Sequence, residues 1–420
     1  MMIRPNLAWR SVAVLSAAVL ALSACGDDAD SPSTSATTGG GAAPGDGVLK
    51  IGTILPQTGS LAFLGPPEFA GVDVAIKEIN ANGGVLGKPV TIQHMDSGDT
   101  STDIATQSVN KLLTDKTDVI IGAASSSVSL SVIDKITGAG VVQISPANTS
   151  TALTTYNDKG LYFRTAPPDT LQGRVLGDLI VQDGNATTGM LVLNDSYGTG
   201  LAENAKAEIE SGGGKVAVSV TYDPKAADFS ADVAKIKAAN PDAIAIIGFD
   251  ETKKIVPKLI EAGLKTKKWY FVDGNIADYS KDFAPGTLKG FKGTQPGAAT
   301  KDDFKKRALE INKDLKDWNY AVESYDATML AALAAIEAGS DNPAEIAKHL
   351  GTVSKGGEKC TDFKSCADLL KAKKDIDYDG LSGPISFNDA GDPAEATIGV
   401  YTYDENNKLT SDVKYQTGKI

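Results

Sequence analysis

The chain has 420 residues, more than one comfortable hydrophobic core holds, so two lobes are expected. Apolar residues make up 42% of the chain, which is ordinary for a soluble protein. The formal net charge is −12 and no basic stripe accompanies it, which argues against a nucleic-acid-binding protein.

The N-terminal residues have the pattern of a signal peptide. Arg4 and Arg10 precede an apolar run over 11–21 that is too short to cross a membrane as a stable helix. The run ends just before Cys25 in a sequence that resembles the bacterial lipoprotein box, where cleavage leaves an N-terminal cysteine that carries lipid. We therefore expect a signal peptide over 1–24, export, and a lipid on Cys25 that anchors the protein at the outer face of the cell membrane or in the periplasm.

The residues that follow the cleavage point predict a linker. Residues 25–47 are mainly Ser, Thr, Gly, Ala, Pro and Asp. Because this composition cannot bury a core, we expect a flexible tether between the membrane and the fold.

From residue 48 onward, strand-like and helix-like stretches alternate. The helix-like stretches carry apolar residues at helical spacing, as Phe69, Val72, Ile76 and Ile79 do. Such alternation predicts βαβ units and a parallel sheet. The expected strands of this block are 48–55, 90–94, 119–121 and 141–144, and its expected helices are 68–80, 104–113 and 128–136.

A double proline at 167–168 interrupts the alternation and predicts a crossover between two lobes. The alternation then restarts, so two similar α/β blocks stand in tandem. The second block has expected helices at 171–181, 201–210, 231–239 and 254–262 and expected strands at 189–193, 215–220, 243–247 and 269–272. The last third has expected helices at 302–317, at 320–338 and from Pro343 onward, and strand-like runs at 385–388, 398–403 and 413–416.

Two further cysteines lie close together near the C-terminal end. If Cys25 carries lipid, Cys360 and Cys366 remain as a pair in an exported protein. Export permits disulfides, so the sequence favours a bond that staples a local loop. The alternative is two free thiols.

Little in the sequence indicates catalysis. The chain has two histidines, His94 and His349, and we interpret both as structural because neither has an obvious partner. No Gly-x-Ser-x-Gly elbow occurs, and no cluster of His, Cys and Asp has metal-ligand spacing. We therefore expect no enzyme, no cofactor and no metal.

Polar or aromatic segments follow five of the expected strands, at the edge where open α/β sheets bind ligands. Ser126 follows 119–121 at a helix start, where free N–H groups and the helix dipole can hold a carboxylate. The alternative interpretation is that Ser126 only caps the helix. The remaining segments are 145–149, 194–197, 248–250 and 273–275, in which Asp195 and Asp250 are interpreted as turn residues.

From about residue 51 to residue 403, the sequence resembles the branched-chain amino-acid (Leu/Ile/Val) binding proteins of ABC importers. Each matching piece is short, and the specificity comes from their occurrence together and in order. The pieces are Ile51-Gly52, Pro56-Gln57-Thr58-Gly59, Glu78-Ile79-Asn80-Ala81-Asn82-Gly83-Gly84-Val85-Leu86-Gly87, Val119-Ile120-Ile121-Gly122, Ile144-Ser145-Pro146, Asn148-Thr149-Ser150, Phe163-Arg164-Thr165, Asp169, Gln172-Gly173, Tyr197-Gly198 and Asp228-Phe229-Ser230.

The resemblance implies an α/β fold of the type I periplasmic-binding-protein kind. Two Rossmann-like lobes are joined by a three-strand hinge and close on the ligand. The implied N-terminal lobe comprises 48–166 and 297–397, and the implied C-terminal lobe comprises 167–296 and 398–420.

The resemblance also implies ligand contacts on the N-terminal lobe. Ser126, Ala147 and Thr149 match positions that hold a ligand carboxylate through hydroxyl and backbone N–H groups. A further expected contact, Leu64, stands where relatives often place an aromatic residue.

On the C-terminal lobe, Asp273 matches an acid that takes the ligand ammonium, and Tyr197 and Phe249 match aromatic wall positions. Phe249 lacks the hydroxyl of the more usual tyrosine, and Asp273 is shorter than the glutamate of some relatives. The side-chain specificity is therefore open.

These implications define an expected function. The protein is expected to be a monomeric solute-binding lipoprotein that binds a small amino acid, branched-chain or related, or an amide in the inter-lobe cleft. It would deliver this ligand to the permease subunits of an ABC importer, and it would bind no nucleic acid. One alternative is a sensing receptor of the same fold. A second is an α/β enzyme, for which the sequence supplies no nucleophile–base pair.

Overall fold

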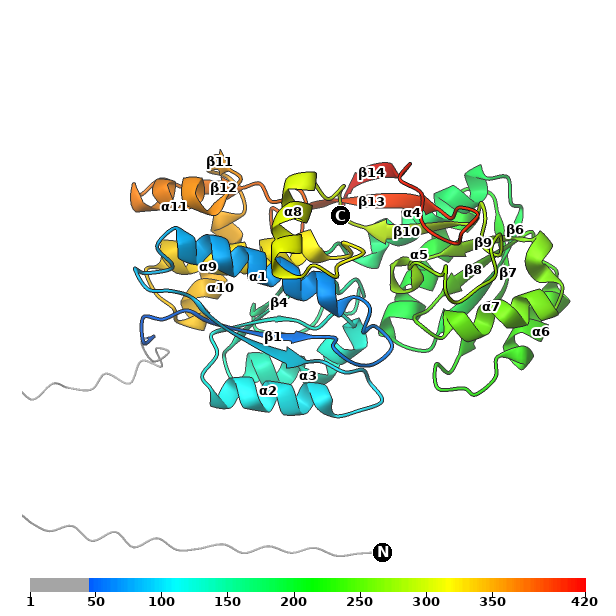
Figure 1. The fold of residues 1–420 in the computed structure, drawn as a ribbon, viewed down its shortest axis with the longest axis horizontal. Helices are drawn as coiled ribbons and strands as arrows, with labels where there is room; N and C mark the ends of the chain where they lie inside the picture. The colour runs from blue at the N-terminus through cyan, green and yellow to red at the C-terminus, as the bar shows by residue number, and fades with distance from the viewer. Residues whose placement is uncertain (1–44) are drawn as a thin grey trace, which may run out of the picture. The chain divides into compact units, whose positions relative to one another are not determined.

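The structure is a computed structural model that describes residues 45–420. It is an α/β fold with two helix-covered sheets in two lobes, and a small additional two-stranded sheet (Figure 1). The expected signal peptide, Cys25 and all but the last three residues of the expected tether lie outside the described residues. Those three residues are attached to the fold, because the Gly47 N–H donates to Asp341 Oδ2 at 2.7 Å.

The first sheet is entirely parallel, with strand order β2-β1-β3-β4-β5, which confirms the parallel sheet that the alternation predicts. Its strands are β1 (Lys50–Leu55), β2 (Thr91–Asp96), β3 (Val119–Gly122), β4 (Val142–Ser145) and β5 (Tyr162–Arg164). The helices between them are α1 (Gly65–Ala81), α2 (Ile104–Thr114) and α3 (Ser126–Gly138).

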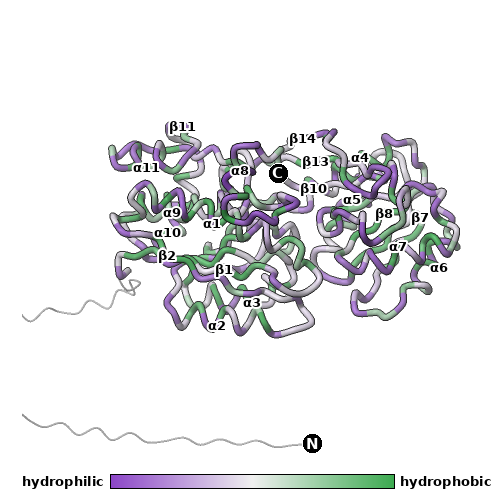
Figure 2. The backbone as a smooth tube through the Cα atoms, in the orientation of Figure 1, coloured by the Kyte–Doolittle hydropathy of each residue, from purple (hydrophilic) through white to green (hydrophobic). Residues whose placement is uncertain are grey.

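Both faces of this sheet are covered by helices, because successive side chains of a strand point to opposite faces. Ile120 packs with α2 and α3, whereas Val119 and Ile121 pack in a separate cluster with α1. The second cluster also contains helices encoded much later, α9 (Ala321–Ala338) and α10 (Pro343–Val353). Figure 2 colours the backbone by hydropathy and shows hydrophobic stretches (green) on the strands of this sheet, including β1.

The second sheet has seven strands in the order β14-β13-β10-β9-β8-β6-β7. The strands β6 to β10 pair in parallel, and β13 and β14 are added antiparallel at one edge. The strands are β6 (Thr187–Leu193), β7 (Lys215–Tyr222), β8 (Ala243–Ile247), β9 (Lys268–Phe271), β10 (Lys292–Pro296), β13 (Glu395–Thr402) and β14 (Lys414–Lys419).

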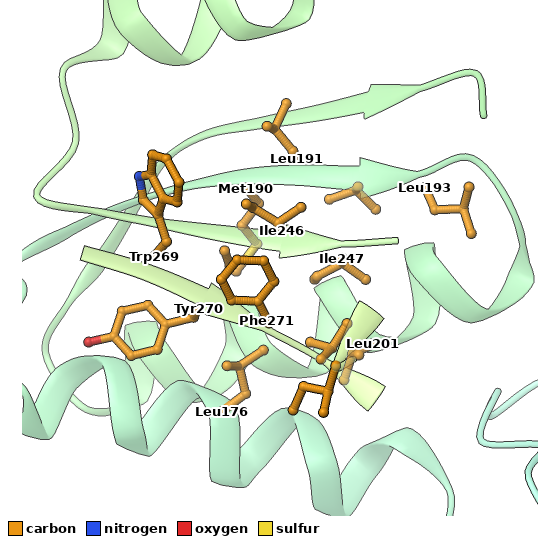
Figure 3. Packing of buried hydrophobic residues seen from close by; sticks show 14 of the residues in the cluster. Leu176, Met190, Leu191, Leu193, Leu201, Ile246, Ile247, Trp269, Tyr270 and Phe271 are labelled. Carbon is orange, nitrogen blue, oxygen red and sulfur yellow. The ribbon is translucent and has the colours of Figure 1, made fainter. Parts of the chain in front are cut away.

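Four helices accompany this sheet: α4 (Asp169–Gln182), α5 (Ser196–Ser211), α6 (Ser230–Ala239) and α7 (Thr252–Glu261). Short 3-10 turns η1 (Leu264–Thr266) and η2 (Asp273–Asn275) flank β9. Figure 3 shows strand residues such as Ile247 and Phe271 packed together with Leu176 of α4 and Leu201 of α5.

Two elements expected in the last third differ in the structure. The helix expected over 302–317 is α8 (Asp302–Ile311) only, because Asn312 Oδ1 accepts from the Asp314 N–H and replaces helical bonding with a local turn. The expected strand at 385–388 is wrong: Phe387 makes only an isolated bridge to Pro393, so no ladder forms.

The segment between α10 and β13 holds β11 (Glu358–Cys360), α11 (Phe363–Lys371) and β12 (Ile376–Tyr378). A disulfide joins Cys360 at the end of β11 to Cys366 in α11, with an S–S distance of 2.11 Å. The α11 helix is capped by Asp362, which accepts from the Ser365 N–H at 2.9 Å. The bond thus staples the local loop between the two cysteines, as the sequence favoured.

Candidate ligand-binding site

The turn after β3 brings the start of α3 to the carboxyl edge of the first sheet. Gly122 has φ +121°, and a Cβ there would lie 2.2 Å from the Ile54 carbonyl oxygen, so this close approach requires glycine. The cap of α3 is Ser125, whose Oγ accepts from the Val128 N–H. The capping interpretation of Ser126 is therefore wrong, because Ser126 is the first helical residue.

The hydroxyl of Ser126 ties the start of α3 to the loop after β4. Its Oγ accepts from the Thr149 and Ser150 backbone N–H groups, each at 3.2 Å. Arg164 also holds this loop, because its guanidinium donates to the carbonyl oxygens of Asn148 and Ser150. The backbone around Thr149 is thus fixed from both sides.

Arg164 itself is completely buried and forms an ion pair with buried Asp392, with Nε–Oδ1 at 2.6 Å. Thr154 completes this network, because its hydroxyl accepts from Arg164 and donates to Asp392. Because Arg164 is buried and its donors are paired, we expect it to hold the loop after β4 rigidly in place.

The opposing wall follows strands of the second sheet. The rings of Tyr197, at the start of α5, and Phe249, after β8, stack with centroids 5.3 Å apart and planes 14° apart. Asp273 follows β9 as the first residue of η2. Its Oδ1 accepts from Tyr197 Oη at 2.6 Å and from Gln172 Nε2 at 2.9 Å, and its Oδ2 accepts from Tyr320 Oη at 2.6 Å.

These two walls leave a cavity of about 10 Å³ between them. That is about the room of one water molecule, so the side chains of the two walls nearly fill the site in this conformation. Its lining combines apolar side chains, two serines and one acid, and it contains no Lys, Arg or His. The lining residues are Leu61, Leu64, Ala124, Ser125, Ser126, Ala147, Tyr197, Phe249, Asp273, Gly274 and Tyr320.

A set of buried polar atoms behind this wall has no hydrogen-bond partner among the described residues. They are Thr149 Oγ1, both carboxylate oxygens of Asp169, and Gln172 Oε1. Asp169 begins α4, and its N–H donates to the Thr149 carbonyl oxygen at 2.7 Å. Gln172 reaches Asp273 from the same helix, so these unpartnered atoms adjoin the acid that lines the cavity.

Burial makes both acids costly to ionise, and Asp273 adds to the cost for Asp169. Burial raises the pKa of Asp169 well above its ordinary value, and the neighbouring Asp273 raises it further. Burial also raises the pKa of Asp273, although hydrogen bonds from Tyr197, Tyr320 and Gln172 oppose this rise. The site therefore holds two adjacent buried acids and lines its cavity with no cationic side chain.

Direct contacts join the helix starts of the two sheets beside the cavity. Ser127 Oγ, at the start of α3, donates to Asp195 Oδ2 at 3.1 Å and lies 2.9 Å from Ser196 Oγ at the start of α5. Ser150 Oγ donates to the Ser196 carbonyl oxygen at 2.9 Å. Burial raises the pKa of Asp195 to about 6.

The turn interpretation of Asp195 was thus incomplete. Asp195 does cap α5, because its Oδ1 accepts from the Gly198 N–H at 2.7 Å, but its other carboxylate oxygen contacts the facing element. Asp250 pairs with Lys253 at 2.6 Å and fits its interpretation as a residue of a local turn.

Six of the seven residues that the sequence singled out for ligand contact line the cavity, and ligand contact itself stays a prediction. Thr149 is buried beside the cavity but does not line it. Sequence reasoning missed Leu61, Asp169, Gln172 and Tyr320. Asp169 and Gln172 were within a matching piece of the family resemblance, which was the signal that could have identified them.

Other sequence expectations fall elsewhere in the structure. His94 bonds to Asp73 and Thr53, and His349 bonds to Glu337, away from the cavity. Over residues 45–420, no three or more His, Cys, Asp or Glu side chains are grouped as metal ligands would be. Within the same residues, no helix is both long enough and apolar enough to cross a membrane.

Two α/β lobes with a small enclosed cavity at the strand ends define the class of type I periplasmic binding proteins. The chain belongs to the periplasmic binding protein family, whose family model matches residues 48–408.

Individual relatives of the chain are named as amino-acid-binding proteins. The Leu/Ile/Val-binding protein homolog 1 of Brucella abortus is 30% identical over 326 residues, which are 74% of this chain and 83% of that protein. The Leu/Ile/Val/Thr-binding protein of Salmonella typhimurium is 28% identical over 370 residues, 86% of this chain and 93% of that protein.

Among solved structures, a branched-chain amino acid transporter substrate binding protein from Streptococcus pneumoniae in complex with isoleucine superposes with a TM-score of 0.73 at 23% identity. The match covers 88% of this chain and all of that one. At this identity the likeness concerns the fold, and it confirms the two-lobed α/β architecture expected from the sequence.

Proposed function

We propose that this protein is an extracytoplasmic solute-binding lipoprotein of an ABC importer, and that it encloses a small aliphatic amino acid between its lobes. The observation that carries the proposal is the pair of buried acids, Asp169 and Asp273, beside a cavity whose lining holds no cationic side chain. An amino-acid ammonium supplies the missing positive charge.

The energetics favour a cationic group at this end of the cavity. A buried charge without a partner costs about 3–5 kcal/mol, so both acids cannot ionise together without a counter-charge. An ammonium on Asp273 would supply that counter-charge, and its positive charge would also lower the cost of ionising the neighbouring Asp169. Binding should therefore displace the proton that the raised pKa of Asp169 retains.

The other end of the ligand would face the start of α3. First-turn N–H groups of a helix lack intrahelical acceptors and carry the positive end of the dipole. Ser126 lies there, lines the cavity and accepts two backbone bonds, which leaves its own proton free for a ligand carboxylate.

The apolar lining sets the side-chain class. Leu61 and Leu64 from one wall and Phe249 from the other give the site apolar surfaces, which suit an aliphatic side chain once the lobes open to admit a ligand. Relatives named as Leu/Ile/Val-binding proteins support the same class.

The anchor, the delivery step and the lobe boundaries are parts of the same proposal. The lipoprotein-like sequence before Cys25 supports a lipid anchor, and the family of the chain supports handover to a permease. We place the first crossover at 166–168, between β5 of one sheet and β6 of the other.

Calorimetric titration of the full chain tests the ligand class. We expect leucine, isoleucine or valine to bind, 4-methylpentanoate (leucine without its amine) to bind at least 100-fold more weakly, and Asp273→Asn to lose a similar factor for leucine. Asp250→Asn, an exposed acid outside the cavity, is the matched control and should bind as the unmodified chain does.

Two further readouts sharpen this test. Titration in buffers of different ionisation enthalpy should show a proton released on binding, and affinity should rise with pH as Asp169 becomes easier to ionise. Binding of 4-methylpentanoate or benzoate in preference to every amino acid would refute the proposed ligand class.

A separate experiment tests the lipid anchor. We expect cells that carry Cys25→Ser to lose membrane retention of the protein.

A further inference from the structure

Tyr320 occupies an unusual backbone position. It is the residue before the first turn of α9 and has φ 58° and ψ 12°, in the left-handed region. For a bulky aromatic residue this conformation is an outlier that costs about 1–3 kcal/mol and persists only where the surroundings enforce it. Its side chain is buried, with 2% exposed, and lines the cavity.

The hydroxyl of Tyr320 is one of three side-chain donors to Asp273, and it is the one that comes from the other lobe. Tyr197 begins α5 and Gln172 lies in α4, and both helices pack on the seven-stranded sheet that also carries Asp273. Tyr320 begins α9, which packs against α1 and contacts β3 and β4 of the five-stranded sheet. The 2.6 Å bond from Tyr320 to Asp273 Oδ2 is therefore a bond between the two lobes.

We propose that Tyr320 is a positioning and specificity-determining residue that orients the Asp273 carboxylate for a cationic ligand group only when the lobes are closed. This inference rests on the proposed function, because it assigns the recognition of the ligand amine to Asp273. It couples amine recognition to closure: the hydroxyl reaches Asp273 only when α9 and η2 meet, and the same bond favours the closed form before ligand binds.

The number of acceptor positions defines what the closed site admits. A carboxylate offers about four lone-pair positions. Gln172 and Tyr197 occupy both on Oδ1 and Tyr320 occupies one on Oδ2, and the Gly274 backbone N–H also interacts with this carboxylate, so at most one position on Oδ2 remains for the ligand. One N–H of an ammonium fits that position, whereas a guanidinium that pairs through two parallel bonds needs two.

The pair Tyr320→Phe and Tyr197→Phe separates this role from simple packing. Each variant keeps a buried ring and removes one 2.6 Å hydroxyl bond to Asp273, but only Tyr320→Phe removes a bond between lobes. The full chain carries spectroscopic labels on exposed positions of α2 and α6, and the distance between them reports closure. Stopped-flow binding of leucine and of 4-methylpentanoate reports rates and amine selectivity.

We expect Tyr320→Phe to lengthen the label distance in the ligand-free protein and to speed leucine release about tenfold, with little change in the association rate. Leucine should lose more affinity than 4-methylpentanoate, so the preference for the amine falls. Tyr197→Phe should weaken leucine binding without changing the label distance before ligand is added.

Two results would overturn the inference. One is an unchanged label distance in ligand-free Tyr320→Phe, and the other is an equal loss of affinity for both ligands in that variant. If the unmodified chain binds no amine at all, the proposed function fails instead, and the label distance still decides whether Tyr320 holds the lobes together.

Discussion

Removing the carboxylate of Asp392 should strongly destabilise the fold. Asp392→Ala leaves the Arg164 guanidinium, which is completely buried, without its counter-charge, while its bonds to the carbonyl oxygens of Asn148 and Ser150 and to Thr154 remain. Breaking a buried pair from one side costs about 3–5 kcal/mol. With an unfolding entropy of about 2.1 cal/mol/K per residue over the described part of the chain, this corresponds to a fall in Tm of about 4–6 °C.

Urea unfolding followed by circular dichroism measures this loss. The matched control is Lys77→Ala, which breaks the exposed pair with Glu310 and should change the free energy of unfolding by less than about 1 kcal/mol. Ligand affinity should also fall in Asp392→Ala, because Arg164 supports the backbone on both sides of Thr149. An unfolding free energy within 1 kcal/mol of the unmodified chain would show that Arg164 finds compensation elsewhere, and the argument from burial would be wrong.

Two more predictions concern contacts outside the cavity. Ser127→Ala removes the hydroxyl that joins α3 to Asp195, so leucine release should quicken by about two- to fivefold in stopped-flow measurements, and an unchanged release rate would count against a closing role. Burial raises the pKa of Glu323 to about 8, so its contribution to stability is complete below about pH 4 and is lost as pH rises to 8. Urea unfolding at pH 5 and pH 8 measures how the unfolding free energy depends on pH. We expect this dependence to be flatter in Glu323→Gln than in the exposed control Glu310→Gln, by at most about 1.4 kcal/mol per pH unit. Equal slopes in the two variants would contradict this.

Most of the fold was predictable because its periodic patterns report burial directly. The strand expected at 119–121 lies in β3, and Ile120 points to one face of the sheet while its neighbours point to the other. The helix expected at 302–317 failed because the Asn312 side chain competes with the helix for the backbone, and that competition depends on local geometry that the apolar pattern does not carry.

The site was less predictable than the fold, because its residues come from separate segments that meet only in the folded chain. Ser126, Asp273 and Tyr197 follow strands, so their shared edge could be inferred. Tyr320 could not be found in this way, because it contributes through a left-handed backbone position that no sequence rule assigns to tyrosine. Asp169 was a matching piece of the family resemblance, but the burial of both its carboxylate oxygens is visible only in the structure.

The position of α9 in the sequence has a consequence for how the chain folds. All of residues 321–335 are buried, against α1 and the five-stranded sheet, yet they are synthesised after the whole parallel part of the second sheet. Until then, one face of the first sheet has no complete cover, and contacts of such long sequence separation form slowly. A nascent chain would therefore emerge without a finished first lobe, and that lobe would close only after most of the second lobe has been made.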